Sequence, residues 1–113
     1  MDIESFRTWC LELPGTTEGI KWEAHLCFMV EEKIFVIMDI EPPHGFALKV
    51  DPVDFDNLVT REGISQAGHM ARRQWIGVVS LSTLQGAELK SRVLQSRALV
   101  LSKLSKKLQA KYS

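Results

Sequence analysis

Apolar residues near the start of the chain recur every three or four positions, as they do on one face of a helix. This spacing predicts an amphipathic helix over residues 2–13, with Asp2 suited to cap its first turn. Pro14-Gly15 should end the helix, because Pro disfavours a helical residue before it and Gly permits positive φ. The face that we expect to be buried holds Ile3, Phe6, Trp9, Cys10 and Leu13.

The middle of the chain changes to short runs of β-branched and aromatic residues, which are typical of strands. Residues 26–30, 34–40 and 46–50 are predicted to be three consecutive antiparallel strands. Glu31-Glu32-Lys33 connects the first two, although it lacks the Gly or Asn that favoured two-residue hairpin turns use. A short strand is also expected at residues 20–22.

A second helix is well delimited by its end signals. Asp51 can cap it, Pro52 suits the first helical position, and Gly63 supplies a left-handed stop. A short edge strand is expected at residues 64–68 and a stronger strand at residues 75–81.

The last third of the chain predicts one long terminal helix. Ser82 with Gln85 three residues later resembles a capping box that would open it. Its apolar face would hold Leu89, Val93, Leu94, Val100, Leu101, Leu104 and Leu108.

These elements together predict an α+β fold of two layers, with an antiparallel sheet and the N-terminal, middle and C-terminal helices on one of its faces. We expect residues 1–113 to form a single domain, since no linker, repeat or low-complexity segment interrupts them. A composition of 45% apolar and 25% charged residues is ordinary for a globular chain with its own core. No apolar run is long enough for a membrane span and the first residues are acidic, so a cytoplasmic location is expected.

The net charge of zero conceals an asymmetry between the two halves. Residues 1–60 carry four Lys or Arg against twelve Asp or Glu, a net charge of −8. Residues 61–113 carry ten against two, a net charge of +8. This pattern has two interpretations: an anionic partner for the second half, or neutralisation of one half by the other.

Residues that could carry catalysis or hold a metal show no recognised spacing. Cys10 and Cys27 lie in apolar patterns and are expected to be buried thiols rather than a disulfide or a nucleophile. His25, His44 and His69 do not form a known ligand motif. With no nucleophile or phosphate-loop motif present, we expect no enzyme activity, no cofactor and no metal site.

The segment Arg72-Arg73-Gln74-Trp75 is the strongest candidate for a nucleic-acid site. Guanidinium groups bind phosphate bidentately, and an indole can stack on a base. In the alternative interpretation Trp75 belongs to the core and the arginines pair with acids of the first half. A wider basic surface would come from the terminal helix, through Arg92, Arg97, Lys103, Lys106, Lys107 and Lys111.

The outer face of the sheet offers a second kind of site. Strand alternation places Trp22, Phe35, Ile37 and Ala47 away from the helices. An exposed apolar face of this kind would bind a protein partner or a second copy of the chain, so either a monomer or a weak homodimer is expected.

Several blocks of this chain resemble the MmcQ/YjbR-like family of small bacterial proteins. They are the run from Leu13 to Trp22, Phe46 to Pro52, Arg61-Glu62-Gly63, and Ala71 to Ile76. Their order and spacing are as expected, and the resemblance extends over nearly the whole chain to about residue 104.

The resemblance implies a CyaY-like, or frataxin-like, α+β fold and a DNA-binding function through a double-wing arrangement of β elements. Two departures weaken parts of this expectation: Gln74 stands where relatives often have His, and Glu31-Glu32 stand where they tend to have Gly. Iron binding, which the fold also suggests, would need an acidic ridge that the first helix lacks. Carried onto this chain, with the terminal lysines added, the expected DNA contacts are Lys21, Trp22, Arg72, Arg73, Trp75, Lys103, Lys106 and Lys107.

Overall fold

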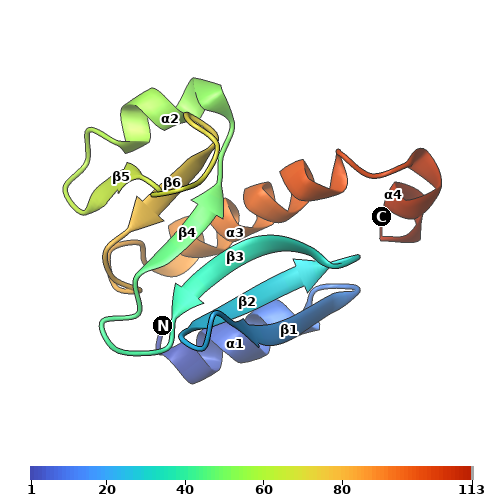
Figure 1. The fold of residues 1–113 in the computed structure, drawn as a ribbon, viewed down its shortest axis with the longest axis horizontal. Coiled ribbons are helices and arrows are strands. Elements are labelled where there is room, and N and C mark those ends of the chain that lie inside the picture. The colour runs from blue at the N-terminus through green and yellow to red at the C-terminus, as the bar shows by residue number, and fades with distance from the viewer. Residues whose placement is uncertain (113) are drawn as a thin grey trace.

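The computed structural model describes residues 1–112, in which a six-stranded antiparallel sheet is covered by helices on one face (Figure 1). This confirms the predicted α+β, two-layer fold. The elements are α1 (Ile3–Glu12), β1 (Thr16–Lys21), β2 (His25–Val30), β3 (Lys33–Asp39), β4 (Phe46–Lys49), α2 (Pro52–Leu58), β5 (Ile64–Gln66), β6 (Trp75–Val78), α3 (Gly86–Leu101) and α4 (Lys106–Lys111).

The strands lie in the order β1-β2-β3-β4-β6-β5, so the consecutive antiparallel strands and the edge position of β5 are as predicted. Residues paired across antiparallel strands point to the same face of a sheet. The register Phe28↔Val36↔Leu48↔Ile76 therefore forms one row that faces the helices. This row belongs to the single core cluster, to which α1, α2 and α3 all contribute.

Two of the predicted caps begin their helices. Asp2 Oδ1 accepts a hydrogen bond from the Ser5 amide at 2.8 Å, and Asp51 Oδ1 accepts one from the Val53 amide at 3.0 Å. Phe6 and Cys10 of α1 are fully buried, as the helical spacing predicts. Burial raises the pKa of the Cys10 thiol to about 12, so it stays protonated at neutral pH.

The β2–β3 hairpin closes with a two-residue turn in which both Glu31 (φ +49°) and Glu32 (φ +63°) are left-handed. Non-Gly residues adopt this conformation at a cost of about 1–2 kcal/mol each. Just beyond the turn, the register shifts at a β-bulge that leaves Phe35 without a partner on β2. Phe35 consequently turns into the core and is fully buried, so its predicted place on the outer face is wrong.

Glu32→Gly should raise the free energy of unfolding by about 0.5–1 kcal/mol, because Gly adopts positive φ without strain but loses more chain entropy on folding. Glu32 is exposed, so little packing is lost. Urea denaturation would measure the change. Glu32→Ala is the control: it removes the same carboxylate and retains the Cβ, and an equal gain in that variant would contradict the explanation by turn strain.

The predicted terminal helix differs from the structure at both of its ends. Gln85 Nε2 donates to the Ser82 carbonyl oxygen and closes a turn, so α3 begins only at Gly86 and the capping box is wrong. The helix then stops at Leu101, and Ser105 caps a separate helix, α4, through the Leu108 amide.

The buried face of α3 also differs from the apolar pattern. Leu94 is 45% exposed, whereas Ser96 and Arg97 are buried. Arg97 Nη2 donates a hydrogen bond to the Pro14 carbonyl oxygen, and the Arg97 guanidinium lies over the Tyr112 ring. This side chain therefore connects α3 to two segments that are distant from it in sequence. No helix within residues 1–112 is long and apolar enough to cross a membrane.

Candidate functional site

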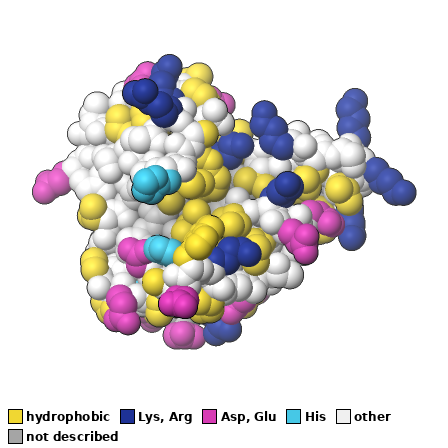
Figure 2. All heavy atoms as spheres, viewed as in Figure 1, with side chains coloured by type: hydrophobic (Ala, Val, Ile, Leu, Met, Phe, Trp, Pro, Cys, Tyr) yellow, Lys and Arg dark blue, Asp and Glu magenta, His cyan; other side chains and the backbone are white. Residues whose placement is uncertain are grey.

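A row of mostly small residues crosses the outer face of the sheet, on the side opposite to the helices. Strand pairing places one residue of each strand in this row, and none is charged. Because small side chains cover little of the backbone beneath them, this face is hollowed at its centre (Figure 2). In strand order the row is Gly19, Cys27, Ile37, Ala47, Gly77 and Ser65.

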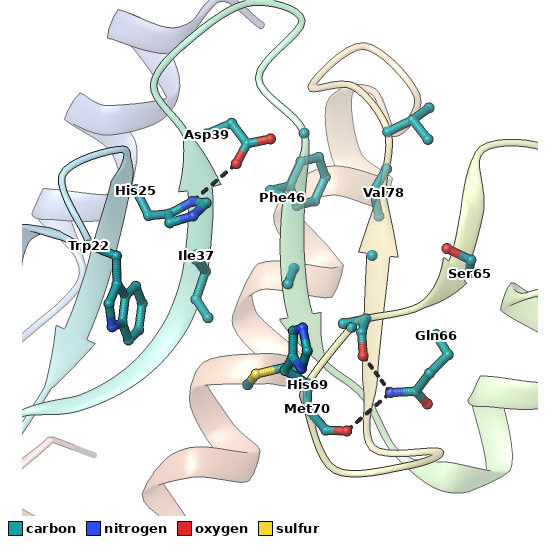
Figure 3. Close-up of a pocket in the computed structure, with 16 residues that line it drawn as sticks. Trp22, His25, Ile37, Asp39, Phe46, Ser65, Gln66, His69, Met70 and Val78 are labelled. Atoms are coloured by element: carbon teal, nitrogen blue, oxygen red, sulfur yellow. Dashed lines mark hydrogen bonds and ion pairs between the residues drawn. The ribbon is translucent and has the colours of Figure 1, made fainter.

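The hollow forms a cleft of about 750 Å³, which we call the outer-face cleft. Ile37, Ala47 and Gly77 lie at its floor. Trp22 stands on one side of Ile37, and His69 with Met70 stands on the other (Figure 3). The volume falls within the range of small-molecule sites, roughly 300–1,000 Å³.

The first wall of the outer-face cleft comes from the β1–β2 turn. Trp22 has a positive φ of 53°, and its side chain is 66% exposed with its ring edge-on to His25 at 6.0 Å between centroids. His25 Nδ1 lies 3.1 Å from Asp39 Oδ1, but the atom is buried and the contact lacks hydrogen-bond geometry. Register pairing aligns Lys21, His25 and Asp39 across three strands at this end of the sheet.

The opposite wall is the loop between β5 and β6, which one side chain holds in place. Gln66 Nε2 donates to the carbonyl oxygens of Ala67 (2.7 Å) and Met70 (3.3 Å). Its Oε1 accepts from the Arg73 amide at 2.9 Å. The wall is therefore fixed by hydrogen bonds within the loop and needs no occupant to form.

The basic segment that the sequence singles out lies in and beside this loop. Arg73 Nη2 pairs with Asp56 Oδ2 at 2.8 Å, as the alternative interpretation of the arginines expects. Arg72 is exposed, and no carboxylate within residues 1–112 pairs with it. Trp75 is only 8% exposed, in agreement with its interpretation as a buried strand residue, so its indole does not present a face for stacking on a base.

The three C-terminal lysines of the predicted site divide into two groups. Lys103 lies near Lys49 of β4, and the pKa of Lys49 is lowered first by burial and then by the charge of Lys103. No carboxylate of the described residues forms an ion pair with either lysine. Lys106 and Lys107 are exposed on α4, away from the outer-face cleft.

Several other cations are engaged in the folded protein itself. Arg92 pairs with Asp54 at 3.2 Å, and Arg97 is buried, so neither belongs to the wider basic surface that the sequence predicts. Together with Arg73–Asp56 and Lys111–Glu31, the Arg92–Asp54 pair links the two halves of the chain. The charge asymmetry is thus partly neutralised internally. On the outer face, Lys and Arg lie mainly along the upper border and near α4, and Asp and Glu mainly along the lower border (Figure 2).

The residues that line the outer-face cleft overlap only in part with the residues predicted from the sequence. Of the predicted DNA contacts, Trp22 alone lines the cleft, and Ile37 and Ala47 of the predicted outer-face site line it as well. Gln66 and Met70, which also line it, belong to neither predicted site. Gly77, a small residue at an outward position of a predicted strand and paired with Ala47, was a usable further signal. No three His, Cys, Asp or Glu side chains among residues 1–112 converge on a point that would hold a metal ion.

Comparison with known proteins identifies the family. A crystal structure of a Pseudomonas syringae protein matches with a TM-score of 0.74 and 24% identity, covering 88% of this chain and 99% of that one. The crystal structure of DR2400 from Deinococcus radiodurans, with domain DUF419, matches with a TM-score of 0.80 and 25% identity, covering 97% and 86%. A search of curated proteins finds no match. The YjbR family model matches residues 11–99, and this chain therefore belongs to the YjbR family.

Proposed function

We propose that this protein binds single-stranded DNA across the outer face of its sheet, without a catalytic step. The observation that carries the proposal is the pair Lys49 and Lys103, two neighbouring cations without a carboxylate partner among residues 1–112. Two cations that repel each other bind an anion favourably, because its charge removes the repulsion. A phosphate group is the anion that a nucleic-acid strand supplies at regular intervals.

The Arg72 segment extends this basic end of the sheet. Lys49 pairs in register with Trp75, and the Val50 amide donates to the Gln74 carbonyl oxygen at 2.8 Å, so the turn that carries Arg72 lies beside the end of β4. Lys103 follows the C-terminus of α3 nearby. Three cations from three separate segments thus lie near the end of β4 and support contacts to neighbouring phosphates.

The exposed Trp22 favours a single strand over a duplex, because only unpaired bases present a face on which an indole can stack. The β2–β3 hairpin takes no part in the proposed contact. Glu31 of its turn is held by Lys111 at 3.4 Å and by the Tyr112 hydroxyl, and the exposed Glu32 carboxylate repels phosphate.

Lys49→Gln/Lys103→Gln should weaken DNA binding and reduce its dependence on salt. Each phosphate contact to single-stranded DNA contributes about 0.7 to the slope of log K against log salt concentration, through release of counterions. The slope of the double variant should therefore be smaller by about 0.7 if the two lysines share one phosphate, and by about 1.4 if each contacts its own. Fluorescence anisotropy with labelled single-stranded and duplex DNA at several salt concentrations would measure both affinity and slope.

Lys90→Gln is the matched control, because Lys90 lies on the helical side of the protein, over the Trp9 ring. It removes one positive charge without touching the outer face, so its slope should equal that of the unaltered protein. Absence of DNA binding at low salt, or an unchanged slope in the double variant, would contradict the proposal. Recovery of a defined protein partner in a nuclease-insensitive pull-down would instead favour a protein-interaction role for the outer face.

A further inference from the structure

We infer that the outer-face cleft binds a nucleobase that carries an exocyclic amino group. This inference rests on the proposed function, since the base would belong to the bound DNA strand. A free nucleotide offers the same ring and is the alternative source of the base. The reasons lie in the floor, the walls and the polar end of the cleft.

The floor is apolar and low enough to admit a flat ring. Ile37, Ala47 and Gly77 lie side by side on three neighbouring strands. At Gly77 an added Cβ would meet the Ala67 Cα at 3.6 Å, an ordinary van der Waals contact, so the absence of a side chain there keeps this part of the floor low. Most small-molecule sites combine such an apolar surface with a few placed polar groups.

The walls offer groups that bind aromatic rings. Trp22 is more than half exposed, so the face of its indole is available for stacking on an aromatic ring. On the other side of Ile37, Met70 brings a thioether, which makes favourable contacts with aromatic rings (Figure 3). Since Gln66 already fixes this loop, an occupant would not have to order it, and less binding free energy is lost.

The polar end selects the edge of the base. Asp39 keeps 55% of its side chain exposed, so its carboxylate has acceptor capacity beyond the contact with His25. Carboxylates accept hydrogen bonds from amino groups such as N4 of cytosine. The same carboxylate repels phosphate, which belongs at the opposite end of β4, near Lys49 and Lys103. A nucleotide can therefore place the amino group of its base near Asp39 and its phosphate near Lys49.

Calorimetric titration of the protein with cytidine and uridine monophosphate would test the inference. We expect the cytidine nucleotide to bind about tenfold more tightly, a ratio within the range that one good base-edge contact supplies. Asp39→Ala should abolish this preference. Trp22→Ala should weaken the binding of both nucleotides about tenfold, through loss of stacking. Equal affinity for the two nucleotides in the unaltered protein would overturn the assignment of Asp39.

A pair of variants with equal added bulk tests the place of binding. Ala47→Leu fills the cleft floor and should remove nucleotide binding, whereas Ala98→Leu adds the same atoms to an exposed position of α3 and should not. Thermal unfolding shows whether Ala47→Leu is folded, and Trp22→Ala, at an exposed position, provides the test if it is not. Unchanged nucleotide binding in a folded Ala47→Leu protein would overturn the inference.

Oligonucleotides separate this inference from the proposed function. An oligonucleotide of cytosines should bind more tightly than one of the same length with an abasic site, and Ala47→Leu should remove the difference. If the two oligonucleotides bind with equal affinity and the nucleotides do not bind, the base pocket is refuted. The proposed DNA binding is then still supported. Binding of cytidine monophosphate without binding of DNA would refute the proposed function and retain the pocket for a free nucleotide.

Discussion

Replacement of Phe28 by Ala should lower the free energy of unfolding by about 3–5 kcal/mol. Phe28 is fully buried in the central row of the core-facing sheet surface. Its ring meets the ring of Phe6 edge-on, with centroids 5.9 Å apart and planes at 79°. The substitution removes this contact between the sheet and α1 and leaves a cavity that the surrounding strands can close only in part.

Urea denaturation at constant pH would measure the loss for Phe28→Ala. Val53→Ala is a suitable control, because Val53 is 82% exposed on α2 and its loss should change the free energy by no more than about 0.5 kcal/mol. A loss below about 1 kcal/mol for Phe28→Ala would contradict the described core, since that value is typical of surface positions or minor repacking.

Ser96→Ala should destabilise the protein by about 2–4 kcal/mol, although it removes only one oxygen atom. The buried Ser96 hydroxyl donates to the Phe35 carbonyl oxygen at 2.7 Å and accepts from the Lys49 amide at 2.9 Å. It thereby joins α3 to β3 and β4. Each backbone group left without a partner in the interior costs about 1–3 kcal/mol, so the loss should exceed that of an ordinary surface hydroxyl.

Ser91→Ala, at an exposed position of the same helix, separates helix propensity from the buried contacts. It should leave stability unchanged or raise it slightly, because Ala is the better helix former. Amide hydrogen exchange adds a local measurement: protection of the Lys49 amide should fall in Ser96→Ala. Equal stability of the two variants, with Lys49 still protected, would show that the Ser96 hydroxyl does not satisfy these groups.

Local signals in the chain predict most of the elements because their causes are local. Asp2 and Asp51 cap the helices that follow them, and the alternation from Phe46 to Val50 marks a strand whose core side is as expected. The terminal helix shows the limit of such signals. Leu104 and Leu108 continue the apolar spacing of α3, yet the Ser105 cap starts a new helix between them.

Phe35 and Trp22 show how tertiary structure redirects single residues. Alternation places Phe35 on the outer face, but the β-bulge shifts the register and turns it inward. Trp22 is the last residue of a predicted strand, yet it lies in a turn with positive φ, where its side chain lines the cleft. Neither a bulge nor a left-handed turn of non-Gly residues has a reliable local signal, because neighbouring strands impose both.

The sequence by itself determined most of the helices and strands, most of the core-facing residues and the family, since hydrophobic periodicity and end signals are encoded within a few residues of each element. Only the tertiary structure decided the candidate site. Trp22, Asp39 and His69 come from three separate segments and surround one cleft because of strand register and a loop held by Gln66. In the folded chain Arg92 and Arg97 make internal contacts, whereas Lys49 lies near Lys103. The sequence does not show which charges will pair, because pairing depends on distances that only the folded chain creates.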